Sequence, residues 1–248
     1  MDAASTGARV RPTVDVQMSQ RPARFASIVV EELANQIIAG ALAEHEVLPT
    51  EAELGQEFRF SRTVIREALK MLEERGLVRV EQGRGTTVQS RDAWNLLDPT
   101  VIRIALNYDD DMSLLDNAIT VRRVLEREMA RAAAFRITDD DLGALVTAID
   151  DMAASYDDYD RFRMLDRSFH EIVMKASGND VGLTVVRTIH EHAGMRPALA
   201  KSSSREALER TVTEHRSIYA ALAARDGDAA AERISAHIDF AWADRRRT

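Results

Sequence analysis

Cysteine is absent from this chain of 248 residues. Without thiols the chain can form no disulfide bond and offers no thiolate ligand to a metal, which suits a reducing cytosol. The sequence also has no apolar run near the roughly 20 residues that cross a bilayer, and its start lacks the apolar core of a signal peptide. These absences predict a cytoplasmic protein with no membrane partner. Residues 1–20 are polar and predict a mostly disordered tail.

The formal net charge is −8, and the charge is unevenly distributed along the chain. Residues 21–91 carry ten basic and eleven acidic side chains, whereas residues 92–248 carry 21 and 28. An acidic chain is a poor generic coat for nucleic acid. The length and the hydrophobic content of 45% favour two globular domains with enough apolar side chains for a sizeable core.

Three helices and a β-hairpin are predicted within residues 21–90. The first helix is predicted over residues 25–38, where apolar residues recur with a helical period. Thr50 and Ser61 are suitable N-caps for the second and third helices, and Gly76 is a suitable C-cap for the third. Two short β-type runs around a glycine turn come next. This order of elements is that of a winged helix-turn-helix domain.

Cationic side chains gather at the start of the third predicted helix. Arg62 and Arg66 are four residues apart and therefore share one face of that helix. In a helix-turn-helix this end enters the major groove, where arginine can form two hydrogen bonds to guanine. Arg84 lies between two glycines at the predicted wing tip, within reach of a minor groove or a phosphate. The predicted contacts with double-stranded DNA are Ser61, Arg62, Thr63, Arg66, Gly83, Arg84, Gly85 and Thr86. A solvated helix cap would explain any one arginine alone, but the combination favours DNA binding.

The rest of the sequence is helical almost throughout. Pro99 and its acidic neighbours indicate a linker over residues 91–99. Apolar stripes of helical period then occupy about 100–107, 113–135, 139–155, 159–176, 180–199, 205–225 and 228–244. The sequence thus predicts a mainly α protein, in which a winged helix-turn-helix precedes an all-α bundle of six or seven helices over residues 100–248.

Four polar side chains within this apolar bundle form a candidate metal site. Asp166 and His170 are four residues apart and point from one face of a helix. His215 and His237 lie on the last two predicted helices, and a turn at Gly227 allows these helices to fold back on each other. One carboxylate and three imidazoles suit a divalent transition metal, with zinc preferred and nickel or manganese as alternatives. Each histidine alone is equally explained as a hydrogen-bonded core residue or a surface residue. His190 and His192 fall outside the set, either beside it or on the surface.

The N-terminal pattern resembles the DNA-binding domain of the GntR family over residues 25–89. The matching elements are Leu48-Pro49, Glu51, Leu54, Ser61-Arg62, Val64 to Leu69, Gly76-Leu77 and Gly83 to Thr86. Many members of this family carry an arginine after the first glutamate of the second helix, where it helps to read the operator. This chain has Ala52 there, so we expect different contacts from that helix.

The helical half resembles the FCD effector domain of the FadR-type branch, whose metal-binding members share the Asp-x3-His…His…His set. The resemblance implies a metal that binds a small carboxylate effector, and it places Arg122 as the arginine that pairs with this effector. An exposed ion pair between Arg122 and Glu126 is the alternative. The stretch Trp94 to Pro99 is similar to the linker of galactonate and other sugar-acid regulators, which suggests a sugar acid.

Three functions are compatible with these residues. The first is an effector-controlled DNA-binding regulator, which is expected to be a repressor and a homodimer because symmetric operators need two reading heads. The second is a metalloregulator in which the metal itself is the signal. The third is a metal-dependent enzyme, but the sequence has no HExxH motif, and Glu171 points to a different face from His170. The first is the prediction, with the second as its alternative, and no enzymatic activity is expected.

Overall fold

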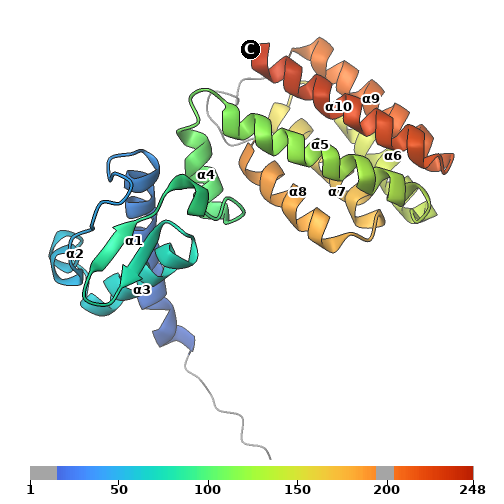
Figure 1. Ribbon diagram of the computed structural model, residues 1–248. Coiled ribbons are helices and arrows are strands. Elements are labelled where there is room, and N and C mark those ends of the chain that lie inside the picture. The colour runs from blue at the N-terminus through green and yellow to red at the C-terminus, as the bar shows by residue number, and fades with distance from the viewer. Residues whose placement is uncertain (1–15, 194–203, 248) are drawn as a thin grey trace, which may run out of the picture. The chain divides into compact units, whose positions relative to one another are not determined.

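The computed structural model describes residues 16–193 and 204–247, and the chain forms two compact units that divide between Asn95 and Leu96. Within these residues, the first unit has three α-helices and a two-stranded sheet, and the second has seven α-helices (Figure 1). The predicted fold class is therefore confirmed. The elements are α1 (Val16–Ile38), α2 (Glu51–Glu57), α3 (Arg62–Glu74), β1 (Val78–Glu81), β2 (Gly85–Val88), η1 (Arg91–Ala93), α4 (Pro99–Asn107), α5 (Ser113–Ala134), α6 (Asp139–Ala153), α7 (Tyr159–Ala176), α8 (Asp180–Ala193), α9 (Arg205–Ala223) and α10 (Gly227–Arg247).

Helix α1 begins earlier than the apolar pattern predicted. It starts at Val16, so residues 16–20 are helical and do not belong to a disordered tail. Glutamine, methionine, alanine and arginine have high helix propensity, which lets the helix extend beyond its apolar stripe in spite of Pro22. The segment expected to be a linker is also partly ordered, because η1 occupies its start and α4 begins at Pro99. Residues 1–15 lie outside the described residues.

The helices of the first unit begin at the residues that the sequence indicates. The Thr50 side chain accepts a hydrogen bond from the backbone of Glu53, and the Glu53 carboxylate accepts one from the backbone of Thr50, so α2 starts with a full capping box. Ser61 caps α3 through a single hydrogen bond, which its hydroxyl accepts from the backbone of Val64. Past the end of α3, Gly76 has φ +73°, and a Cβ built on it would lie 2.0 Å from the carbonyl oxygen of Ala93. Glycine is therefore required there, and it turns the chain directly into β1.

The wing is a short antiparallel hairpin that packs against α3. Val78 pairs with Val88 at the open end, and Glu81 pairs with Gly85 next to the turn. Gly83 and Gly85 have φ +80° and +94°, conformations that other residues rarely adopt. Val47 forms a bridge to Thr87, which fixes the extended segment before α2 to the edge of the hairpin.

Helix α5 packs against α7, α8, α9 and α10 in the second unit, and Figure 1 shows α5 between α10 and α8. Its start is fixed by the buried Asp109, whose carboxylate accepts hydrogen bonds from the backbone of Leu114 and Leu115 at 3.0 and 2.9 Å. These contacts suit the positive end of a helix dipole. Helix α10 includes Gly227 as its first residue, so the turn before it is made by the residues preceding Gly227.

Two expectations about the length of the helices need comment. The helix predicted over 180–199 is described as far as Ala193, and the rest of that range lies outside the described residues. No helix in the described part of the chain combines the length and the apolar character that crossing a membrane requires.

Candidate metal centre and nucleic-acid interface

The start of α3 exposes the residues that the sequence predicted to contact DNA. Ser61, Arg62 and Thr63 are exposed, and the Ser61 hydroxyl accepts a hydrogen bond from the backbone of Val64 at 3.4 Å. At the wing tip the Arg84 side chain is 81% exposed and lies 4.0 Å from the Glu81 carboxylate. A pair at that distance in water holds an arginine only weakly. These cations therefore remain accessible to a polyanion.

Arg66 and Thr86 are the two predicted DNA contacts whose side chains are held most closely by the protein. Arg66 donates two hydrogen bonds to the Glu51 carboxylate of α2, at 3.0 and 2.8 Å, and remains mostly exposed. This pair fixes the direction of the Arg66 side chain. Thr86 is a correction to the prediction, because it is buried at 7% exposure. Alternation along β2 turns its side chain into the domain, so it packs inside the wing and does not face outward.

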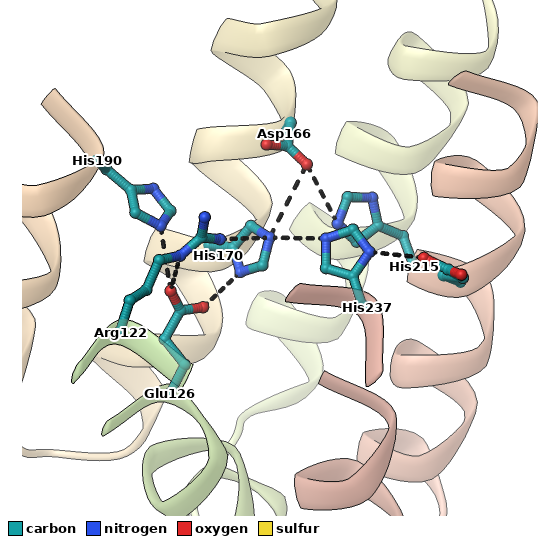
Figure 2. Close-up of polar contacts among 8 residues, drawn as sticks. Arg122, Glu126, Asp166, His170, His190, His215 and His237 are labelled. Carbon is teal, nitrogen blue, oxygen red and sulfur yellow. Dashed lines mark hydrogen bonds and ion pairs between the residues drawn. The ribbon is translucent and has the colours of Figure 1, made fainter. Parts of the chain in front are cut away.

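Asp166, His170, His215 and His237 come together in the bundle, as Figure 2 shows. Asp166 and His170 lie on α7, His215 on α9 and His237 on α10. One donor atom from each residue lies within 4.8 Å of all the others. The Asp166 carboxylate is 3.4 Å from His215 Nε2 and 3.8 Å from His170 Nε2. The two Nε2 atoms of His170 and His237 are 3.2 Å apart. The structure thus brings together all four predicted ligands.

The chemistry of these four residues fits a divalent metal. All three imidazoles are buried, with exposures of 0 to 2%. Both ring nitrogens of His215 are buried without a hydrogen-bond partner among the described residues. A buried polar atom without a partner is costly and therefore rare. A metal bound to His215 Nε2 would satisfy one of these nitrogens.

Burial and neighbouring charges shift the pKa values of Asp166, His215 and His237. It lowers the pKa of His237 to about 3, with a further contribution from the charge of His170. Burial also lowers the pKa of His215 well below its usual value. Burial alone would raise the pKa of Asp166, but the charges of His170 and His215 outweigh it, and the pKa is lowered. Neutral imidazoles and an ionised carboxylate are the forms that ligate metals.

We expect the metal-free protein to lose stability as the pH falls below 6.5. Burial, with the charge of Arg122, lowers the pKa of His190 to about 4, and that of His237 is about 3. In the unfolded chain these histidines become protonated below about pH 6.5, whereas in the folded chain they stay neutral until the pH approaches their lowered pKa values. Folding therefore becomes less favourable as the pH falls. Each such histidine costs about 1.4 kcal/mol per pH unit below 6.5.

Urea unfolding in EDTA at pH 7, 6 and 5, followed by circular dichroism, measures this dependence. His45 is an exposed histidine, so His45→Ala serves as the control and should keep the dependence. A free energy of unfolding that is constant over this range would contradict the prediction.

Arg122 is buried at 9% exposure, which excludes the exposed ion pair considered from the sequence. It does bind Glu126, through its Nε, but this carboxylate is fully buried. The Nη2 atom of Arg122 also lies 3.3 Å from His170 Nε2. The neighbouring Arg123 faces outward and pairs with Asp239 at 2.7 Å. Arg122 therefore adjoins the candidate metal ligands.

On the side of Asp166 the cluster adjoins two small cavities, with volumes of about 40 and 30 Å³. Both are lined by Asp166 and by three arginines from three helices, Arg122, Arg163 and Arg245. Arg245 forms no hydrogen bond or ion pair among the described residues. Its guanidinium is half-buried and interacts with the charge of Asp166, and its N–H donors remain available to an anionic ligand. Arg163 and Arg245 were not predicted as site residues, because no sequence motif distinguishes them from surface arginines.

The two histidines left outside the set differ in their surroundings. His190 is buried, and its Nε2 lies 3.1 Å from Glu126 Oε1, so it belongs beside the cluster. Both ring nitrogens of His192 are buried without a hydrogen-bond partner in the described part of the chain. Glu171, the carboxylate next to His170, instead pairs with Lys175 and Arg187. It therefore faces away from the cluster, as its different helix face predicted.

Comparison with known proteins agrees with the division into two units. The family model for bacterial regulatory proteins of the gntR family matches residues 25–88, and the model for the FCD domain matches residues 117–240. The galactonate operon transcriptional repressor of Escherichia coli (strain K12) is 32% identical over 204 residues, which cover 82% of this chain and 88% of that protein. The HTH-type transcriptional repressor NanR of Cronobacter sakazakii is 28% identical over 221 residues, which cover 89% and 85%.

A solved structure supports the fold alone. Its title is "Lar controls the expression of the Listeria monocytogenes agr system and mediates virulence". The superposition has a TM-score of 0.58 at 18% sequence identity, and it covers 90% of this chain and 96% of the other chain. The matching families and relatives are transcriptional regulators and not enzymes. The chain therefore belongs to the GntR family of bacterial regulatory proteins, and its helical unit carries an FCD domain.

Proposed function

We propose that this protein is a repressor that binds operator DNA as a homodimer and releases it when a small carboxylate, of the sugar-acid type, binds beside a metal in the helical unit. The observation that carries the proposal is the juxtaposition of the four-residue cluster with cavities lined by arginines. A cationic cavity next to a set of metal ligands is suited to an anion that also carries oxygen ligands.

Asp166, His170, His215 and His237 would hold the metal. Three imidazoles and one carboxylate suit zinc best among common metals, with nickel or manganese as alternatives. When bound, the metal would supply a Lewis-acidic position for an oxygen of the effector. The protein side chains define the rest of the site, because Asp166 is the only one of the four with appreciable exposure, 22% of its side chain.

The arginines and hydroxyl groups around the cavity are suited to bind a sugar acid. Arg122 and Arg245 offer charge-assisted hydrogen bonds to a carboxylate. Tyr159 and Thr211 line the larger cavity, and their hydroxyl groups suit a polyhydroxylated chain. A volume of about 40 Å³ holds only a few water molecules, so the long arginine side chains must move when an effector enters. The names of the relatives, a galactonate operon repressor and NanR, point to the same class of ligand.

The DNA-reading part of the proposal depends on the exposed cations of the first unit. Arg62 and Arg66 on α3 would read the major groove, and Arg84 on the wing would bind a phosphate or the minor groove. Two such heads, supplied by a homodimer, match an operator with two-fold symmetry. This role places the protein in the cytoplasm, where bacterial DNA lies.

Fluorescence anisotropy of the DNA upstream of the protein's own gene tests the function. The DNA is titrated with protein at two salt concentrations, and then with sugar acids and other small carboxylates, with zinc or with EDTA. We expect tight, salt-sensitive binding that one compound reverses only when metal is present. Binding that no carboxylate alters would overturn the proposed effector. Release by zinc alone would identify the metal as the signal.

Replacing Arg245 with alanine should weaken the response to the effector without weakening DNA binding. The fold should persist, because Arg245 makes no hydrogen bond among the described residues and interacts with Asp166 only through its charge. We expect the effector concentration for half-release to rise about tenfold or more. The matched control is Arg246→Ala, because Arg246 faces outward and pairs with Asp116 at 3.1 Å. Equal responses of the two variants would remove Arg245 from the effector site.

A further inference from the structure

Glu126 on α5 determines which nitrogen of His170 carries the proton. The Glu126 carboxylate lies 2.6 Å from His170 Nδ1, and an ionised carboxylate can only accept hydrogen bonds. Arg122 Nη2 lies 3.3 Å from His170 Nε2, and a guanidinium can only donate. Both contacts are satisfied by a single neutral form, in which Nδ1 carries the proton. In the metal-free protein the lone pair of Nε2 accepts the hydrogen bond from Arg122, and a metal would take the place of that bond.

Glu214 on α9 has the same relation to His237. Its carboxylate lies 2.9 Å from His237 Nδ1, whereas the other ring nitrogen, Nε2, approaches His170. Arg210 donates a hydrogen bond to the other oxygen of Glu214 at 2.9 Å, and its guanidinium stacks on Phe240 at 3.5 Å. Glu214 is therefore fixed from both sides. It leaves the Nε2 lone pair of His237 directed at His170 Nε2, 3.2 Å away.

We propose that Glu126 and Glu214, two carboxylates outside the set of metal ligands, fix His170 and His237 in the form whose Nε2 lone pairs converge on the metal, and that Glu126 also holds Arg122 beside it. This inference depends on the proposed metal binding and adds two positioning residues to it. Carboxylates that receive the second N–H of a ligating histidine orient the ring and make it a stronger ligand. His215 has no such partner in the described structure.

Glu126 differs from Glu214 in what its second oxygen binds. Glu126 Oε1 accepts hydrogen bonds from Arg122 Nε and lies 3.1 Å from His190 Nε2. One fully buried carboxylate thus joins a metal ligand on α7, the effector arginine on α5 and a histidine on α8. The two hydrogen bonds of Glu214 described above go to Arg210 and His237, and of these two residues only His237 lines the arginine-lined cavity. The two carboxylates therefore share one role, and Glu126 has a second.

The experiment compares Glu126→Gln, Glu214→Gln and Glu171→Gln in the full-length protein. Glu171 is the control, because it follows His170 in sequence but pairs with Lys175 and Arg187. Zinc affinity is measured by competition with a chelator, and the protonated imidazole nitrogens are identified by ¹⁵N NMR of the zinc-loaded protein. We expect each of the first two variants to lose about 10- to 100-fold in zinc affinity. Glu214→Gln should shift the Nδ1 signal of His237, and Glu171→Gln should change neither quantity.

Saturating zinc separates the two roles. At zinc concentrations that fill the site, Glu214→Gln should recover the wild-type effector response in the DNA-release assay, whereas Glu126→Gln should remain impaired because Arg122 is no longer held. Should Glu126→Gln fail to fold, Glu214→Ala, at a partly exposed position, still tests the positioning role.

Each contrary result identifies what is wrong. Wild-type protein that binds no zinc, nickel or manganese overturns this inference together with the proposed metal. Metal binding that is equal in the wild type, Glu126→Gln and Glu214→Gln overturns the positioning role alone. Full recovery of Glu126→Gln in saturating zinc overturns its role in holding Arg122.

Discussion

Replacing His237 with alanine is expected to lower metal affinity by more than about 100-fold, because removal of a ligand should exceed the roughly 10- to 100-fold cost of losing a ligand's hydrogen-bond partner. His237 is buried, and its Nε2 lies 3.2 Å from that of His170, so the substitution removes one of the four donor atoms that converge there. The effector response should be lost together with the metal. DNA binding by the metal-free protein should persist, because the DNA-reading residues belong to the other compact unit. Calorimetric zinc titration and the DNA anisotropy assay measure the two effects.

His192→Ala is the matched control for this prediction. His192 lies in the same unit and is partly buried, but it is outside the cluster of four. The His192→Ala variant should bind metal as the wild type does. If His237→Ala abolishes folding, shown by loss of helical circular dichroism, the cluster is mainly structural. If the variant binds zinc normally, the assignment of His237 as a ligand is wrong.

Replacing Arg66 with alanine should lower discrimination between the operator and unrelated DNA by about 1–3 kcal/mol if Arg66 contacts a base. The physical reason is that a bidentate arginine–guanine contact is lost, whereas a phosphate contact would weaken all sequences equally. Glu51 holds Arg66 by two hydrogen bonds, so the side chain is already ordered before DNA binds. Anisotropy titrations with operator DNA and with a scrambled duplex measure the difference.

Arg205→Ala provides the control for Arg66→Ala. Arg205 is an exposed arginine of the helical unit that pairs with Glu209 at 3.0 Å, so it shares the exposure and the ion pair of Arg66 but not its place on α3. It should bind both duplexes as the wild type does. Unchanged discrimination in Arg66→Ala would mean that Arg66 contacts a phosphate or does not contact the DNA at all.

Local patterns were enough to predict the elements and the candidate ligands. The capping box at Thr50 and the cap at Ser61 involve residues three apart, so they can be read without knowledge of the fold. The spacing of Asp166 and His170 places both on one face of a helix in any fold. The predicted start of the first helix was wrong by several residues, because residues with high helix propensity extend the helix beyond its apolar stripe.

The amino-acid sequence by itself determined the two-part architecture, the caps and the set of four metal-ligand candidates. Only the tertiary structure decided that Arg122 is buried, that Arg245 lines a cavity, that Thr86 points inward and that Glu126 meets His170, 44 residues away. Helical periodicity shows which side chains share a face, but it contains no information about which helix packs opposite that face. The partners of Arg122, His170 and His237 follow from that packing, and so do the protonation states of the candidate metal site.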